Sequence, residues 1–288
     1  MPKIRLDVLL VDRRLAESRA KAHALVMAGQ VRVADQVVLK PATAVDTKAV
    51  LTVDTGPRFV SRGGEKLDAA LEAFAIDVKG LVCADVGSST GGFTDCMLQR
   101  GAVKVYAIDV GKGILHWKLR NDRRVVVMEQ TNARYVESLP EQIDFVTVDA
   151  SFISLKIILP VVKNWIFNRQ AREDREDLKN LSVLGGLRGS KIENGEILAL
   201  IKPQFEAGKK DVARGDGVIR DPEIHKSVLL DVLSFTQHEG FGIRGLIKSP
   251  LLGPKGNAEF LVWLKQVSVG ERGVELNPMV ESVLGISS

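Results

Sequence analysis

Four charged residues stand where the sequence pattern predicts that a strand or a helix begins or ends. Lys202 and Asp149 each follow an apolar run, Glu259 precedes one, and Lys66 lies in the first turn of a predicted helix, "SRGGEKLDAAL". The carboxyl ends of parallel strands share one edge of a sheet, and an antiparallel strand begins at that same edge. We therefore expect two lysines and two carboxylates to meet in one pocket. Taken singly, each is more often a surface charge or half of a simple ion pair.

Pro203 follows Lys202 directly. We expect it to keep Lys202 extended and to prevent a helix from beginning there, which leaves the lysine at the sheet edge. A lysine in this place can act as a base or as an orienting cation. A free lysine has a pKa of about 10.4, so a lysine base near neutrality needs a depression of about three units. Burial and a second lysine act in that direction and neighbouring carboxylates act against it, so a base and an orienting cation both stay open.

A glycine-rich stretch, "ADVGSSTGGFTD" (84–95), lies between a predicted strand and a predicted helix. Such a turn lets a ligand approach the backbone and the helix N-terminus. It matches neither GxxxxGK[ST] nor the dinucleotide pattern GxGxxG, which disfavours a nucleotide-dependent dehydrogenase. A carboxylate at the end of the next strand commonly binds a ribose, and a glycine turn kept for packing alone does not predict one. The candidate ligand-binding residues are Asp85, Gly87, Ser88, Ser89, Gly91, Gly92, Phe93, Asp109 and, for an adenine edge, Asn132.

Seven strand candidates follow residue 64, and most intervals between them can hold a helix. They are "LVCADVG", "VKVYAID", "RVVVMEQ", "IDFVTVD", "EILALIK", "FGIRGLIKS" and "EFLVWLKQ". Strands in alternation with helices predict an α/β fold, a Rossmann-like doubly wound and mostly parallel sheet of seven strands. A charged stretch near 168–194 is longer than such connections usually are, and we interpret it as a mobile excursion.

The first 58 residues predict a different, small α+β module. Two helical patterns, the second with Ser18 as N-cap, precede a hairpin that turns near Ala34 and Asp35 and a short strand near residue 51. This part holds ten Lys or Arg against six Asp or Glu, which is the whole excess of the net charge of +4. A basic module suggests a polyanion partner. The candidate contacts are Arg5, Arg13, Arg14, Arg19, Lys21 and Arg32.

The order "RLDVLL" then "SRAKAHALVMAGQVRV" resembles the small RNA-binding domain named after ribosomal protein S-four, over about residues 4–52. The resemblance implies binding of structured RNA through basic residues. The glycine loop with its later acid resembles the S-adenosylmethionine pocket of Rossmann-like methyltransferases. We therefore expect a small RNA-binding domain over 1–58, a linker over 59–64, a methyltransferase domain over 65–270 and a tail over 271–288.

The lysine, aspartate, lysine and glutamate together resemble the tetrad of the FtsJ-like ribose 2'-O-methyltransferases. With the stretches "VSRGGEKLDAAL", "DVGSSTGGFTDC", "VDASFISL", "LIKPQFEAG" and "GNAEFLVWL", the whole chain resembles the TlyA family of rRNA methyltransferases, which also carry the name haemolysin. The resemblance implies transfer of a methyl group from S-adenosylmethionine to a ribose 2'-hydroxyl of ribosomal RNA. Cytidine of the small subunit, and also of the large one, is the implied target.

Other classes fit the sequence less well. Methyltransferases of this fold that act on amino groups carry an N-P-P-[FY]-like motif where this chain has "DASF". Methyltransferases that act on carbon 5 of pyrimidines need a cysteine nucleophile near a strand end, and neither Cys83 nor Cys96 stands at such a place. The two cysteines form no disulfide framework or metal spacing, so we expect no metal. The absence of a 20-residue apolar run and of a leader-like segment makes the cytoplasm the default and disfavours a membrane-active haemolysin. A non-catalytic ribosome assembly factor is the remaining alternative. Composition sets no oligomeric state.

Overall fold

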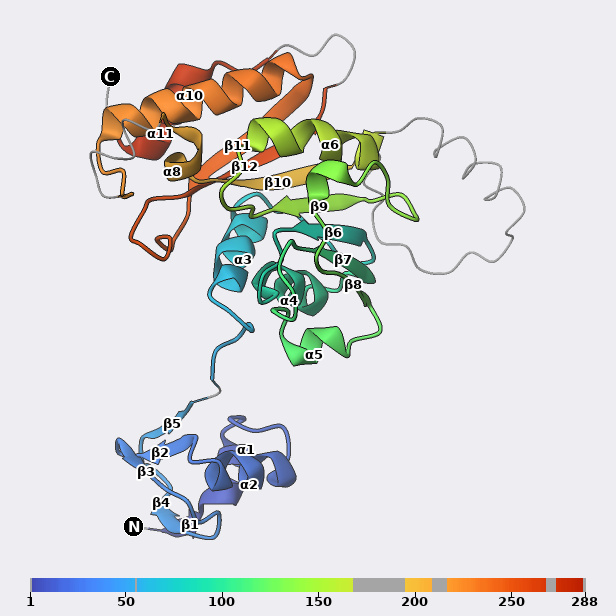
Figure 1. Ribbon diagram of the computed structural model, residues 1–288. Coiled ribbons are helices and arrows are strands. Elements are labelled where there is room, and N and C mark those ends of the chain that lie inside the picture. Colours follow the sequence, from blue (N-terminus) through green and yellow to red (C-terminus); the bar gives the residue numbers. More distant parts are fainter. Residues whose placement is uncertain (1, 55, 168–194, 209–216, 268–272, 287–288) are drawn as a thin grey trace. The chain divides into compact units, whose positions relative to one another are not determined.

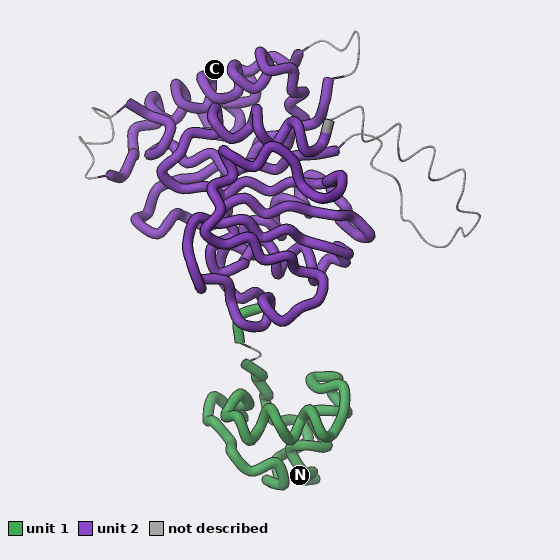
Figure 2. The backbone as a smooth tube through the Cα atoms, turned by 45° about the vertical axis from the view of Figure 1, so that its right-hand side comes forward, with its two compact units in different colours: residues 1–58 green, residues 59–288 purple. Residues whose placement is uncertain are grey.

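A computed structural model describes residues 2–54, 56–167, 195–208, 217–267 and 273–286 (Figure 1). The excursion expected near 168–194 therefore lies outside the described residues. The chain divides into two compact units, residues 1–58 and residues 59–288 (Figure 2). Each has a hydrophobic core of its own.

In its described residues, unit 1 contains two helices and two small antiparallel sheets. The predicted cap of the second helix is present, because Ser18 Oγ accepts a hydrogen bond from the Lys21 backbone N–H at 3.2 Å. The predicted hairpin turn is also present, with positive φ angles of 45° at Ala34 and 65° at Asp35. The elements are β1 (Lys3–Arg5), α1 (Leu6–Asp12), α2 (Arg19–Met27), β2 (Val31–Val33), β3 (Gln36–Val37), β4 (Ala44–Asp46) and β5 (Leu51–Val53). The pairing of β1 with β4 was not expected from the sequence.

Unit 2 is built on one seven-stranded sheet in the order β11-β12-β10-β9-β6-β7-β8. All seven predicted strands form: β6 (Val82–Val86), β7 (Lys104–Ile108), β8 (Val125–Met128), β9 (Phe145–Val148), β10 (Glu196–Ile201), β11 (Phe241–Lys248) and β12 (Phe260–Gln266). Strand β12 runs antiparallel to both β10 and β11, while the pairs among β10, β9, β6, β7 and β8 are parallel. The prediction of a mostly parallel doubly wound sheet is confirmed.

Helices cover both faces of this sheet, because alternate strand residues face opposite sides (Figure 1). Ala84 belongs to the core under α6, α10 and α11, whereas its neighbour Cys83 belongs to the core under α3 and α4. The helical elements are α3 (Gly63–Ala73), α4 (Gly92–Gln99), α5 (Trp117–Arg120), η1 (Ala133–Tyr135), α6 (Leu155–Phe167), α8 (Pro203–Glu206), α10 (Pro222–His238) and α11 (Leu276–Leu284).

The expectation that Pro203 prevents a helix is wrong. Helix α8 begins at Pro203 itself, since the first helical position needs no N–H partner and proline already has a helical φ angle. Lys202 keeps the extended backbone that was predicted, with φ −112° and ψ 99°. Elsewhere, Phe59 is buried in the core of unit 2, and α11 buries Val280 against the core beneath α10.

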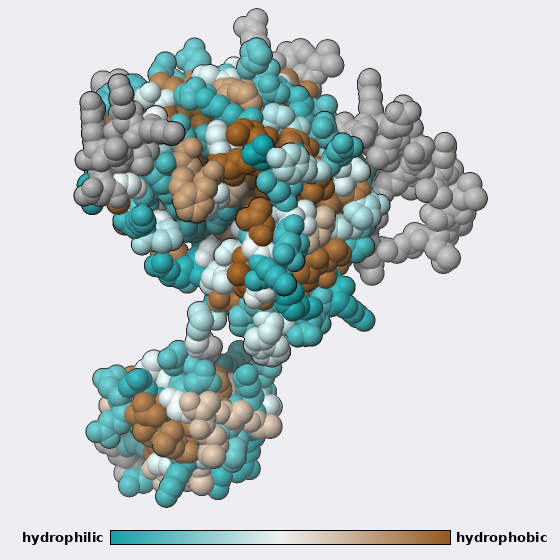
Figure 3. Space-filling model, viewed as in Figure 1, coloured by the Kyte–Doolittle hydropathy of each residue, from teal (hydrophilic) through white to brown (hydrophobic). Residues whose placement is uncertain are grey.

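The visible faces of both units mix hydrophilic and hydrophobic residues (Figure 3), as the surfaces of globular proteins do. Among the described residues, no helix combines the length and the apolar character needed to cross a bilayer.

Candidate active site

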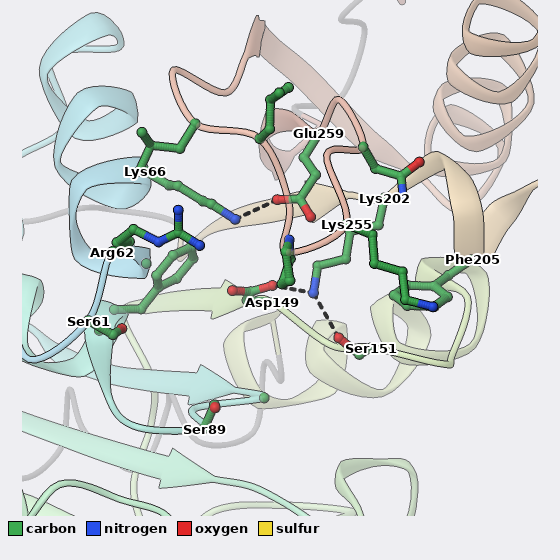
Figure 4. A pocket seen from close by; sticks show the side chains of 18 of the residues that line it. Ser61, Arg62, Lys66, Ser89, Asp149, Ser151, Lys202, Phe205, Lys255 and Glu259 are labelled. Carbon is green, nitrogen blue, oxygen red and sulfur yellow. Dashed lines mark hydrogen bonds and ion pairs between the residues drawn. The ribbon is translucent and has the colours of Figure 1, made fainter. Parts of the chain in front are cut away.

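The four charged residues singled out from the sequence line one pocket of about 660 Å³ at the carboxyl edge of the parallel strands (Figure 4). Lys66 comes from α3, Asp149 and Lys202 follow β9 and β10, and Glu259 directly precedes β12. Because β12 is antiparallel to β10, its first residue pairs with the last residue of β10. The start of β12 therefore reaches the same edge as Lys202.

Within the pocket the four residues form two ion pairs. Lys66 Nζ lies 2.5 Å from Glu259 Oε2, and Lys202 Nζ lies 2.6 Å from Asp149 Oδ1. Lys202 also donates a hydrogen bond of 3.0 Å to Ser151 Oγ, a residue that the sequence pattern did not single out. Both lysines are 8% exposed and Glu259 is 1% exposed. Charges buried to this degree are normally paired, which explains why each lysine has a carboxylate beside it.

Glycine residues allow the close packing around these pairs. A Cβ atom at Gly253 would lie 2.4 Å from Glu259 Oε1, so this position has room for glycine only while the carboxylate keeps its place. A Cβ atom at Gly87, where φ is +82°, would lie 2.6 Å from the backbone oxygen of Asp149. The glycine loop is thereby brought against the strand end that carries Asp149.

The glycine-rich loop supplies a second wall of the pocket. Of the loop residues proposed from the sequence, Gly87, Ser88, Ser89, Gly92 and Phe93 line it. Gly91 does not line it: this residue precedes α4 with φ +96° and packs against Leu119, which a Cβ atom would approach to 2.2 Å.

Three polar candidates from the sequence stand outside the pocket lining. Asp85 is fully buried, and its carboxyl accepts hydrogen bonds from the Thr94 hydroxyl at 2.6 Å and the Thr147 hydroxyl at 3.0 Å. Burial raises the pKa of Asp85 to about 7. Its side chain therefore supports the loop from beneath.

Asp109 and Asn132 also bond to the backbone. Asp109 accepts from the backbone N–H groups of Ser89 at 2.8 Å and Gly111 at 2.7 Å, which ties the end of β7 to the glycine loop. Asn132 Oδ1 accepts from the Arg134 N–H at 3.1 Å and caps η1.

Comparison with known proteins decides the family. The FtsJ-like methyltransferase family matches residues 59–266, and the S4 domain matches residues 4–51. The chain is 46% identical to YqxC of Bacillus subtilis (95% of this chain, 90% of the relative). It is 44% identical to the 16S/23S rRNA (cytidine-2'-O)-methyltransferase TlyA of Mycobacterium tuberculosis (91% and 90%). The chain belongs to the TlyA family of rRNA methyltransferases. A solved structure from Streptococcus thermophilus that carries the hemolysin name shares 38% identity, with a TM-score of 0.66 and coverage of 99% and 95%.

The S4 domain of this TlyA-family chain uses several of its predicted RNA-binding residues internally. Arg5 and Arg19 lie 2.9 and 3.1 Å from the buried carboxylate of Asp7, and the hydrogen bond from Arg5 is the main reason that the pKa of Asp7 lies well below its ordinary value. Arg13 donates to the carbonyls of Thr47 and Ala49.

The other three candidates of the S4 domain differ in their surroundings. Arg32 donates to the Asp35 carbonyl at 3.2 Å. Arg14 and Lys21 are exposed, and within the described part of the chain neither side chain makes a hydrogen bond or an ion pair. These two side chains keep their full hydrogen-bonding capacity for a partner molecule.

Three pocket residues of this TlyA-family chain escaped the sequence analysis because their roles depend on neighbours distant in sequence. Phe152 is 90% exposed and packs at 4.9 Å, between ring centroids, on Phe205. Gln204 has its side-chain oxygen buried, and no donor among the described residues reaches it. All three follow a predicted site residue by two or three positions, which is the one signal that pointed to them. No group of three His, Cys, Asp or Glu side chains in the described ranges is arranged to hold a metal.

Proposed function

We propose that this chain transfers the methyl group of S-adenosylmethionine to a ribose 2'-hydroxyl of ribosomal RNA, with cytidine as the target nucleoside. The observation that carries the proposal is the presence of two lysine–carboxylate pairs, Lys66–Glu259 and Lys202–Asp149, in one pocket beside a glycine loop. The Mycobacterium tuberculosis relative, named as a 16S/23S rRNA (cytidine-2'-O)-methyltransferase, supports the choice of acceptor.

The residues around the glycine loop fit S-adenosylmethionine. Ser88, Ser89 and Gly92 line the pocket where α4 begins, and unpaired N–H groups at a helix N-terminus favour a carboxylate such as that of the methionine moiety. Asp109 is our candidate for the ribose hydroxyls, because its carboxylate keeps lone pairs beyond the two bonds to the backbone. Asn132 is the candidate for the adenine edge. When bound, the cofactor supplies an electrophilic methyl group on a positively charged sulfur.

Lys202 is the residue to which we assign control of the acceptor hydroxyl. Its ammonium is held at 2.6 Å by Asp149 and donates to Ser151, which fixes the direction of Nζ. Because these two contacts fix its direction, we assign Lys202 the orienting role. We assign the hydroxyl proton to the Asp149 carboxylate, which lines the same pocket, because an orienting ammonium has no lone pair with which to accept it. Lys66 and Glu259 line the same pocket as a second ion pair.

Unit 1 is proposed to hold the ribosomal RNA. The S4 match supports this role, and exposed Arg14 and Lys21 are the side chains we expect to contact phosphates.

Transfer of a tritiated methyl group to isolated ribosomal subunits, followed by mapping of the labelled nucleotide, tests the proposal. We expect label on a 2'-oxygen of a cytidine, lost in Lys202→Ala and kept in Lys265→Ala. Lys265 is a matched control, because it forms an ion pair of 2.7 Å with Glu196 in the pair between β10 and β12, several residues away from Lys202 and Glu259. Label on a base atom would contradict the proposed acceptor. Binding to subunits without any transfer would instead support an assembly factor, and leakage of liposomes would support a membrane-active protein.

A further inference from the structure

Two segments that line the pocket are fastened to each other along their length. One runs from Asp149 to Ser154 after β9, and the other runs from Lys202 to Glu206 after β10. At one end, Lys202 contacts Asp149 and Ser151 (Figure 4). In the middle, the Phe205 ring packs on the Phe152 ring.

Glu206 makes the contact at the other end. Its Oε2 accepts a hydrogen bond of 2.5 Å from the Ser154 hydroxyl, and its Oε1 accepts one of 2.8 Å from the backbone N–H of Leu155. Leu155 is the first residue of α6, so a carboxylate from α8 caps a helix that begins 51 residues earlier in the chain. The first N–H groups of a helix lack partners within the helix and favour a negative charge. The contact between Glu206 and the start of α6 is therefore stabilising.

The segment after β9 depends on such support. Phe152 has a φ angle of +65°, in the left-handed region that a bulky residue rarely adopts unless its surroundings hold it there. Phe152 lies between Ser151, which contacts Lys202, and Ser154, which contacts Glu206. We therefore expect that loss of the Glu206 contact would let this backbone relax and move Ser151 and Asp149 away from Lys202.

We propose that Glu206 is a positioning residue for methyl transfer, which holds the segment after β9 so that Asp149 and Ser151 keep Lys202 aimed at the acceptor hydroxyl. This inference rests on the proposed function. It assigns Glu206 no contact with substrate or cofactor.

Because Glu206 acts as an anion, its positioning role should make kcat depend on pH. Burial raises the pKa of its carboxyl above the ordinary value, and the hydrogen bonds from Ser154 and Leu155 oppose that shift only in part. The charged groups that face it are Lys156 of α6, which lowers the pKa, and Asp231 of α10, which raises it and pairs with Lys156. As pH falls through the raised pKa, the carboxyl gains a proton and can no longer accept both hydrogen bonds as an anion.

The test compares Glu206→Ala, Glu206→Gln and the control Glu281→Gln. Glu281 of α11 is a partly buried carboxylate that forms an ion pair of 2.7 Å with Lys226 of α10. We expect Glu206→Ala to lower kcat by about 100-fold, the scale of a misplacement of about 1 Å, with the KM for S-adenosylmethionine unchanged. Glu206→Gln is neutral, as the protonated carboxyl is, and keeps only one of the two acceptor oxygens, so it should retain only part of kcat at neutral pH. The acid limb of its kcat–pH profile should move to lower pH, because the amide does not titrate.

Three outcomes would overturn the assignment. The first is a kcat of Glu206→Ala within a few-fold of the control. The second is a loss of cofactor affinity in Glu206→Ala, measured by calorimetry, that parallels the loss of kcat. The third is a kcat–pH profile of Glu206→Gln with the same acid limb as that of the unsubstituted protein. Should Glu206→Ala not fold, the pH profile of Glu206→Gln decides alone. A failure of the proposed function looks different, because the unsubstituted protein would then put no methyl group on a 2'-hydroxyl.

Discussion

Substitution of the buried pair of Lys66 and Glu259 can show whether the pair serves methyl transfer or the stability of the fold. At 2.5 Å and an effective dielectric constant of about 20, the Coulomb attraction of the pair is about 7 kcal/mol. Removal of both charges from water costs several kcal/mol for each ion, which cancels most of that attraction. The pair as a whole should therefore contribute little to the free energy of unfolding.

Single substitutions should behave very differently from the double one. Lys66→Met leaves the Glu259 carboxylate, 1% exposed, without its partner, and a buried charge left alone costs about 3–5 kcal/mol. Glu259→Leu should cost a similar amount for the converse reason. The double variant removes both charges and keeps the volume, so it should unfold within about 1 kcal/mol of the unsubstituted protein, or be more stable.

Urea unfolding of the four proteins, combined with methyl transfer to ribosomal subunits, checks both parts of this reasoning. We expect the double variant to be as stable as the unsubstituted protein and to have lost activity. That result would show that the pair serves the chemistry of the pocket and not the stability of the fold. Single substitutions that cost less than about 1 kcal/mol, the range of exposed ion pairs, would refute the electrostatic argument. An active double variant would refute the assignment of the pair to the catalytic pocket.

Three further predictions concern the lysine, the first unit and the buried aspartate. Lys202→Ala should abolish methyl transfer and leave calorimetric binding of S-adenosylmethionine nearly intact; loss of binding or continued turnover would contradict its assigned role. Removal of residues 1–58 should weaken binding to ribosomal subunits and flatten its dependence on salt, since the slope falls by about one for each lost phosphate contact, and unchanged affinity would exclude RNA contacts by unit 1. The pKa of Asp85 is raised from 3.8 to about 7 in the folded protein, so the folded state binds a proton more tightly than the unfolded state and stability falls as pH rises from about 4 to 7. Asp85→Asn should remove up to about 4 kcal/mol of that decline, seen as a flatter pH dependence in urea unfolding; parallel curves for the two proteins would show that Asp85 does not titrate in this way.

The strands and the general location of the site follow from local patterns. Apolar runs in alternation with helical stretches predicted all seven strands of unit 2, because burial on both faces of a sheet needs continuous apolar residues. The positions of Lys202 and Asp149 after such runs predicted that both side chains reach the same edge. The helix that begins at Pro203 was missed, since we gave the restraint on the preceding residue more weight than the tolerance of proline at the first helical position.

Contacts between distant residues were beyond the reach of the same reasoning. Lys66 and Glu259 are 193 residues apart, and no local pattern says which lysine pairs with which carboxylate. Nor does any spacing show that Asp85 bonds to two threonines beneath the loop, or that Arg5 and Arg19 share the buried Asp7.

The sequence by itself determined the order of strands and helices, the basic excess of the first 58 residues and the charged residues at strand ends, because each of these depends on residues close together in the chain. The tertiary structure alone decided which charges are paired, which candidate residues face the pocket and how Glu206 reaches the first turn of α6. These are matters of packing between β9, β10 and β12, whose strand ends are brought together only when the sheet has formed.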